Sequence, residues 1–187
     1  MAILPIRIAG DPVLHSPAAP VTSFDESLHE LISDMFETMD AAPGVGLAAP
    51  QVGVGLRLFV YSYPDDDGIP WRGVAINPEL WITPAPAVAG GEDDEEGCLS
   101  FPGERYPLVR SEHARLRAVD GDNSPIDIAV SGWRARILQH EFDHLDGSLY
   151  LDRLDSQFDR SVLRTMRKRG WGRPEQAWTP GFDQLEG

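Results

Sequence analysis

Two histidines four residues apart, with a glutamate directly after the first, constrain this chain more than any other feature of its sequence. They form the segment HEFDH at 140–144, and only a helix brings His140 and His144 onto one face at that spacing. Two imidazoles on one helical face can bind a divalent metal ion. Glu141 would then lie beside the metal without binding it, where a general base for hydrolysis must stand. The segment therefore predicts a helix over 133–145 and a metal-dependent hydrolase.

The composition is that of one globular domain with more acidic than basic residues. The chain has 187 residues, of which 42% are hydrophobic, so it can bury a full core. Its formal net charge of -14 argues against a nucleic-acid binder and a specific DNA partner, because phosphate binding depends on clustered Lys and Arg. Cys98 is the only cysteine, which excludes an internal disulfide and suits a reducing compartment. No apolar run approaches the length of a membrane span, so we expect a cytoplasmic protein without a membrane partner.

Apolar periodicity predicts two more helices, one on each side of a sheet in the sequence. Residues 25–42 carry apolar side chains at helical spacing, and Ser23 and Glu26 fit a capping box. The other helix is predicted over 157–169, followed by Gly170. Alternating apolar residues predict strands at 56–63, 73–77, 80–83, 114–119 and 126–130. The predicted fold class is α+β, with antiparallel sheets packed around a central metal-binding helix and with an N-terminal and a C-terminal helix.

Residues 1–170 are expected to form a single catalytic domain. Residues 171–187 are rich in Gly and Pro and lack periodicity, which predicts an extended or partly disordered tail. The acidic run at 92–96 is expected to be a solvated loop. Asp143 is expected to be a group on the helix surface or beside the ligands.

Two histidines are too few for a catalytic metal site, which usually has three protein ligands and one open position. In the large metalloprotease groups the third ligand lies downstream. Here Tyr150 stands where a histidine would follow, and Glu175, the first downstream glutamate, lies in the predicted tail. Cys98 is the better candidate, because it offers the only thiolate in the chain. Two other interpretations stay open: a metallopeptidase with a downstream ligand, and a non-catalytic module whose structural metal has a fourth protein ligand.

Three segments in order resemble the motifs of peptide deformylase. They are GVGLAAPQ at 44–51, EGCLS at 96–100 and QHEFDHLDG at 139–147, and the resemblance covers roughly residues 3–170. It implies hydrolytic removal of the formyl group from the N-terminal methionine of new polypeptides, so the partners would be N-formyl-methionyl nascent peptides. It also implies Fe2+ as the usual metal, with Zn2+, Ni2+ or Co2+ able to occupy the same site.

The resemblance implies a role for each matching residue. The metal ligands would be Cys98, His140 and His144. Glu141 would be the general acid/base, which takes a proton from water and passes it to the leaving amine. Gln51 and the backbone N–H of Leu99 would donate to the formyl oxygen, a type of contact worth about 3 to 4 kcal/mol in other enzymes. Arg105 would help to hold the peptide backbone.

Spacing also suggests where a substrate would lie. Gly44 and Gly46 lack Cβ atoms, so the backbone of a peptide can pass close to their loop. Ile137 and Trp133 stand three and seven positions before the first histidine, on nearly the same helical face. With Val45 they are predicted to wall an apolar pocket that suits a methionine side chain.

A cluster of cations in and just after the C-terminal helix contrasts with the acidic character of the chain. It consists of Arg164, Arg167, Lys168, Arg169 and Arg173, with no acidic residue between its ends. Together with the family resemblance, the cluster predicts contact with the ribosome. The alternative is that cations gather at this helix end because they complement its macrodipole.

Overall fold

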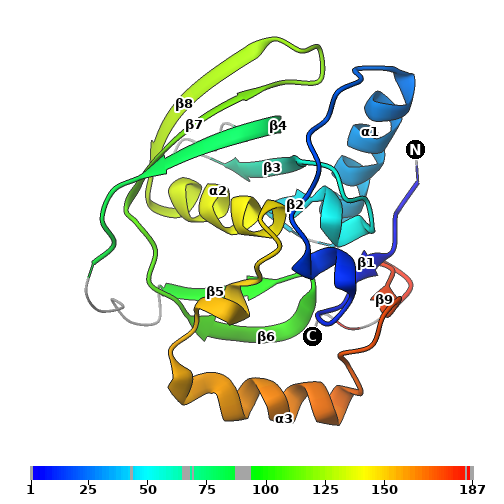
Figure 1. Ribbon diagram of the computed structural model, residues 1–187, viewed down its shortest axis with the longest axis vertical. Coiled ribbons are helices and arrows are strands. Elements are labelled where there is room, and N and C mark those ends of the chain that lie inside the picture. The colour runs from blue at the N-terminus through cyan, green and yellow to red at the C-terminus, as the bar shows by residue number, and fades with distance from the viewer. Residues whose placement is uncertain are drawn as a thin grey trace.

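The computed structural model describes residues 2–42, 44–64, 68, 70–86, 94–183 and 185. It confirms the α+β class, with helices and antiparallel sheets (Figure 1). The described helices are α1 (Glu26–Ala41), α2 (Gly132–Leu145) and α3 (Asp159–Arg169). Helix α2 runs through the middle of the molecule, with the largest sheet on one side and a two-stranded sheet on the other. None of the described helices is both long enough and apolar enough to cross a membrane.

The largest sheet has five antiparallel strands in the order β2-β3-β4-β7-β8. Their bounds are β2 (Gly46–Ala48), β3 (Leu58–Pro64), β4 (Pro70–Ile82), β7 (His113–Val119) and β8 (Pro125–Ser131). Strands β3, β7 and β8 match predicted strands to within two residues at each end. The hairpin of β7 and β8 curls over α2, so this sheet encloses the helix from one side (Figure 1).

Strand β4 joins two segments that the sequence predicted as separate strands. Pro78 has no backbone N–H, and Asn77 has a positive φ of 50°. The pairing of β4 with β7 therefore shifts between Ile76 and Glu79, but the strand continues on both sides of the irregularity. Asn77 is held there by Val21, because its side chain accepts from the Val21 N–H and donates to the Val21 carbonyl, both at 2.8 Å.

Several strands were not predicted from the sequence. Besides β2, they are β1 (Ile6–Arg7), β5 (Glu95–Cys98), β6 (Phe101–Pro107) and β9 (Ala177–Trp178). Strand β5 pairs antiparallel with β6, and β1 pairs antiparallel with β9. Segments of two to four residues are too short to show alternation, and β6 contains Pro102 and Gly103, which interrupt it.

The N-terminal ends of the outer helices differ from the prediction, whereas Gly170 follows the last helix as predicted. Asp25 is the N-cap of α1, and its side chain accepts from the Leu28 N–H at 3.2 Å. The capping box predicted on Ser23 and Glu26 is therefore wrong. Helix α3 begins two residues later than predicted, because a separate 3-10 turn precedes it. Gly170 follows α3 in the left-handed conformation, with φ 69°.

Helix α2 is enclosed on both sides, so most of the residues it carries are buried. On one side, Ile137 and Leu138 join Phe59 and Leu116 of the largest sheet in a buried cluster. On the other side lie β5, β6 and the segment after α2, whose buried side chains form a second cluster around Phe101. Charged groups on α2 therefore interact in surroundings of low polarity, where electrostatic interactions are strong.

The segment after α3 folds back onto the start of the chain. Trp178 in β9 is 2% exposed, and Trp171 packs edge-on against Phe101 with 5.0 Å between ring centroids. A Cβ on Gly10 would collide with the backbone of Gly172, so these two segments are in close contact. Trp171 and Trp178 in the segment predicted as a tail therefore pack against the domain, whereas Phe182 is 80% exposed.

Candidate metal centre and active site

Three buried side chains bring their donor atoms together between α2 and β5. His140 and His144 lie one turn apart on α2, and Cys98 is the last residue of β5. The two Nε2 atoms are 3.2 Å apart, and Cys98 Sγ is 3.4 Å from His144 Nε2. Tetrahedral bonds of about 2.05 Å to nitrogen and about 2.3 Å to sulfur would give edges of about 3.3 Å and about 3.6 Å. The three donors therefore fit around one metal ion, and no fourth Cys, His, Asp or Glu of the described chain belongs to this group.

The surroundings of the two imidazoles favour a cation between them. His140 Nδ1 lies 2.6 Å from Glu96 Oε1, which leaves Nε2 facing the other donors. Burial by itself lowers the pKa of His140, but the negative charges of Cys98 and Glu96 outweigh it and hold that pKa well above its ordinary value. The same negative charges would attract a metal cation in place of the proton on His140. Burial and the neighbouring His140 lower the pKa of His144 well below its ordinary value, so this imidazole is neutral, the form that binds metals.

Glu96 is the centre of a buried network of charges behind the metal ligands. Its carboxylate accepts from Arg110 at 2.7 and 3.1 Å and from Arg136 at 3.0 Å. Burial by itself raises the pKa of Glu96, but His140 and Arg110 outweigh it and hold that pKa well below its usual range. Glu96 is 4% exposed, so the expectation of a solvated loop at 92–96 is wrong for this residue. Residues 92 and 93 of the acidic run lie outside the described residues.

Asp143 belongs to the same network and is 5% exposed. It accepts from Arg110 at 2.6 Å and from Arg153 at 2.5 Å, so Arg110 bridges the carboxylates of Asp143 and Glu96. Of the two places expected for Asp143, the structure shows the one beside the ligands. Removing one partner from a buried ion pair costs about 3 to 5 kcal/mol, because the other charge stays buried without compensation. The network therefore fixes the orientation of α2 against β5.

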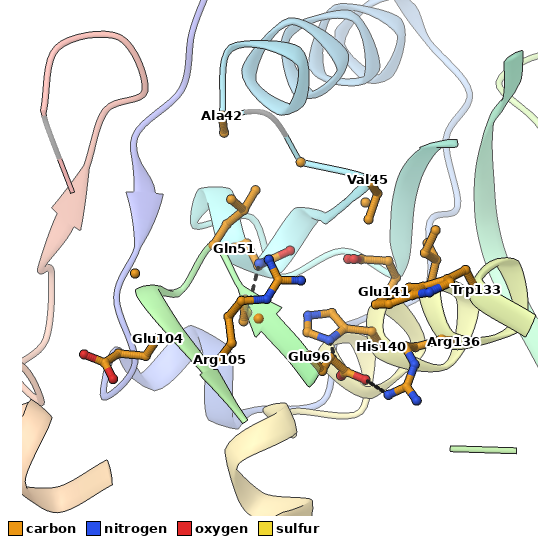
Figure 2. Close-up of a pocket in the computed structure, with 17 residues that line it drawn as sticks. Ala42, Val45, Gln51, Glu96, Glu104, Arg105, Trp133, Arg136, His140 and Glu141 are labelled. Carbon is orange, nitrogen blue, oxygen red and sulfur yellow. Dashed lines mark hydrogen bonds and ion pairs between the residues drawn. The ribbon is translucent and has the colours of Figure 1, made fainter. Parts of the chain in front are cut away.

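Glu141 points into the cavity beside the metal donors (Figure 2). Glu141 is 4% exposed, and its Oε2 atom is buried without a hydrogen-bond partner among the described residues. Burial raises the pKa of Glu141 to about 7. Gly46 on β2 faces this carboxylate, and a Cβ at that position would collide with it. A carboxylate with these properties can accept a proton and return it near neutral pH.

Gln51 presents an amide donor next to Cys98. It lies in a 3-10 helix (Ala49–Val52) that follows β2 and is 1% exposed. Its Oε1 accepts from the Ala48 N–H at 2.8 Å, which turns Nε2 toward Cys98 Sγ at 3.6 Å and Ser100 Oγ at 3.4 Å. Leu99, the residue after Cys98, lines the same cavity. An uncharged donor in this place suits a reaction in which negative charge develops on an oxygen.

A cavity of about 380 Å³ opens in front of these groups, within the range of small-molecule pockets. All the residues predicted for substrate binding line it: Gly44, Val45, Gly46, Arg105, Trp133 and Ile137 (Figure 2). Val45 and Trp133 are 41% and 38% exposed, whereas Ile137 is 3% exposed. The cavity therefore has an apolar wall that runs from the surface to the interior of the protein.

The arginines that support the site were not predicted from the sequence. One local signal was available for Arg136, which lies four residues before His140 on a helix whose neighbouring residues are apolar. A charge in that position predicts a buried partner. No local signal identifies Arg110, because Glu96 and Asp143 lie 14 and 33 residues away from it.

Nearly the whole chain is similar in sequence to proteins named peptide deformylase. The pattern of the polypeptide deformylase family matches residues 3–159. The peptide deformylase of Mycolicibacterium paratuberculosis is 50% identical over 189 residues, which cover 97% of this chain and 96% of that protein. The matched region contains the metal donors, Glu141 and the cavity.

Solved structures agree with the sequence matches. A peptide deformylase from Legionella pneumophila has a TM-score of 0.76 at 42% identity, covering 90% of this chain and 96% of that chain. A class I type b peptide deformylase from Acinetobacter baumannii, solved with Met-Ala-Ser bound, has a TM-score of 0.72 at 32% identity and covers 82% of this chain and 99% of that chain. This chain therefore belongs to the peptide deformylase family of metal-dependent hydrolases, which remove the N-formyl group from nascent peptides.

Proposed function

We propose that this chain deformylates N-formyl-methionyl peptides with a metal ion held by Cys98, His140 and His144. The observation that carries the proposal is the carboxylate of Glu141, which lies in the cavity beside three converging donor atoms and whose buried Oε2 has no hydrogen-bond partner among the described residues. A divalent ion in that place supplies Lewis-acid activation of the attacking water and of the formyl group. A set of one thiolate and two imidazoles leaves a position open for such chemistry.

The protein groups supply proton transfer and charge stabilisation in this proposal. Glu141 accepts a proton from the attacking water and later donates it to the leaving amine. The water oxygen bonds to the formyl carbon and the C–N bond breaks, so formate and a free N-terminal amine are released. Gln51 Nε2 and the Leu99 N–H donate to the formyl oxygen while its negative charge develops.

The shape of the cavity supports a methionine at the first position. The apolar wall proposed for the methionine side chain consists of Val45, Trp133 and Ile137. Gly44 and Gly46 also line the cavity, but the space that a Cβ would take is filled by Leu99 at Gly44 and by Glu141 at Gly46. The peptide backbone would run along their loop, and Arg105 would hold it from the other side. The Met-Ala-Ser bound to the Acinetobacter baumannii relative is a peptide that begins with methionine, which supports this arrangement.

A formate-release assay tests the proposal. Metal-loaded protein should release formate from formyl-Met-Ala-Ser in equal amount to the free amine, and it should leave unformylated Met-Ala-Ser intact. Cleavage of peptide bonds in unformylated substrates, without formate release, would instead support the metallopeptidase interpretation. A protein that binds metal but hydrolyses neither substrate would support the structural-metal interpretation.

We propose Fe2+ as the resident metal, with Zn2+, Ni2+ and Co2+ able to occupy the same donors. Oxygen can oxidise Fe2+ and the thiolate beside it, so the Fe2+ protein should lose most of its activity in air. The Ni2+ protein, prepared and assayed in parallel, should keep its activity. Time courses of formate release with and without oxygen measure the difference, and equal decay of the two forms would contradict the assignment.

We also propose that the protein meets nascent chains at the ribosome, in the cytoplasm, through the outer face of α3. The cations of the cluster defined above, from Arg164 to Arg173, are all exposed. Val162 and Met166 pack against the domain, so α3 is held with Arg164, Arg167 and Lys168 outward. Arg169 instead lies over the ring of Trp171, at 5.7 Å from its centroid, and Arg173 follows the helix. An exposed set of cations on an otherwise acidic protein suits a phosphate-rich surface.

Replacing Arg164, Arg167 and Lys168 with Ala should weaken ribosome co-sedimentation at low salt by at least about tenfold, because phosphate contacts are lost. Hydrolysis of formyl-Met-Ala-Ser should be unchanged, since the cavity lies elsewhere. The matched control is the Arg115→Ala, Arg117→Ala variant, which removes exposed cations paired with Asp127 on the outer strands. If the triple variant pellets with ribosomes as well as wild type, the cations serve only as a complement to the helix dipole.

A further inference from the structure

The peptide unit between Leu99 and Ser100 is hydrogen-bonded on both sides. Its carbonyl oxygen, that of Leu99, accepts from the indole Nε1 of Trp178 at 2.8 Å. Its N–H, that of Ser100, lies 3.4 Å from Cys98 Sγ and donates to it. A continuous chain of hydrogen bonds therefore runs from Trp178, 79 residues further along the sequence than Leu99, to the sulfur of the candidate metal ligand.

Trp178 is held firmly enough to direct this peptide unit. It is 2% exposed, and β9, on which it lies, pairs with β1. Next to that pairing, the Ile8 N–H donates to the Gln176 carbonyl at 2.9 Å. The Ala9 N–H donates in turn to the Ser100 carbonyl at 2.8 Å. The carbonyls of Leu99 and Ser100 thus accept hydrogen bonds from Trp178 and Ala9, which lie near opposite ends of the described chain.

We propose that Trp178 is a positioning residue of the active site, which sets the orientation of the Leu99–Ser100 peptide unit through its indole N–H. This inference rests on the roles proposed above for Cys98 and Leu99. If the peptide unit tilts, Leu99 turns about its own backbone dihedrals and its N–H, on the other side of the residue, moves relative to the formyl oxygen. The same tilt weakens the Ser100 N–H donation to Cys98 Sγ.

The position of Trp178 supports a directional role in addition to packing. Donation to a carbonyl polarises the peptide unit and strengthens the N–H on its other end as a donor. A buried carbonyl that loses its hydrogen-bond donor remains desolvated without compensation. Loss of the indole N–H therefore favours a rearrangement of the loop after Cys98. Both effects depend on the N–H of the indole and not on the volume of the ring.

Two replacements separate the N–H from the ring. Trp178→Phe removes the donor and part of the volume, and site-specific incorporation of the benzothiophene isostere of tryptophan removes the donor alone. In both variants we expect kcat for formyl-Met-Ala-Ser to fall by about three- to tenfold, the size of one net hydrogen bond, with KM within twofold of wild type. In the Co2+-substituted variants the sulfur-to-metal charge-transfer band should move to longer wavelength, because the thiolate accepts a weaker hydrogen bond.

Trp171→Phe is the matched control, because it makes the same change in the same tail at a ring that packs on Phe101. It should lower thermal stability by a similar amount, with wild-type kcat and an unshifted Co2+ band. An isosteric variant at position 178 with wild-type kcat and band position would overturn the inference while leaving the proposed function intact. Absence of formate release by the wild type would instead overturn the proposed function, and the Co2+ band would then still report whether Trp178 acts on Cys98.

Discussion

Glu141→Gln is expected to retain the metal and the fold but to lose turnover by about 10²- to 10⁴-fold, the usual contribution of a positioned general acid/base. Glutamine has nearly the same shape as glutamate but cannot accept a proton from water. The replacement also removes a buried carboxylate whose Oε2 has no partner among the described residues. A neutral amide is less costly to bury than an ionised carboxylate, so the free energy of unfolding should be equal to or higher than that of wild type.

Metal content, formate release and thermal unfolding should therefore be measured on the same preparation. Asp146→Asn is a suitable control, since Asp146 directly follows α2 and its exposed side chain pairs with Arg57 at 2.8 Å. Loss of an exposed pair costs at most about 1 kcal/mol, so this variant should keep wild-type turnover. Near-normal formate release by metal-loaded Glu141→Gln would remove Glu141 from the proposed mechanism.

Cys98→Ala should weaken metal binding by roughly a hundredfold or more. Four-ligand zinc sites bind with about 10 to 16 kcal/mol, which makes the share of one ligand about 3 kcal/mol. His140 and His144 would remain as a two-nitrogen site, with the buried charge of Glu96 behind it. At limiting metal concentration, the activity of the variant should fall in proportion to the fraction of sites that hold metal. Excess metal should restore only part of the activity, because the ligand set lacks the thiolate of the wild type.

Cys98→Ser distinguishes a ligand from a packing residue. Serine offers a hard oxygen in place of a soft thiolate, so the preference among Fe2+, Zn2+, Ni2+ and Co2+ should change. The Co2+ form of the wild type should show a sulfur-to-metal charge-transfer band that both variants lack. If the wild type has no such band, or if Cys98→Ser binds each metal as tightly as wild type, Cys98 is a buried residue beside the site and not a ligand.

The motif at 140–144 could be interpreted from the sequence because its information is local. Three positions within five residues define one helical face, and α2 presents them as the spacing predicts. The ends of helices α1, α2 and α3 were predicted to within two residues, because residues within one turn of a helix end determine where it lies. The ends of strands β3, β7 and β8 were predicted to within two residues as well. Cys98 lies 42 residues before His140. Its place beside the histidines was predicted because it offers the only thiolate and because three motifs occur in the family order, not from spacing.

Other features were decided by tertiary structure, because their partners are distant in the sequence. Glu96 was expected to be solvated with the rest of an acidic run. In the fold, Arg110 and Arg136 bind its carboxylate and offset the cost of burying its charge. Trp178 was assigned to a loose tail, and its contact with Leu99 spans 79 residues. Periodicity records which side chains share a face of one element. Periodicity does not show which charged group or carbonyl of another element lies opposite a given side chain. A polar side chain can be buried only where such a partner binds it, so the tertiary structure decides its burial.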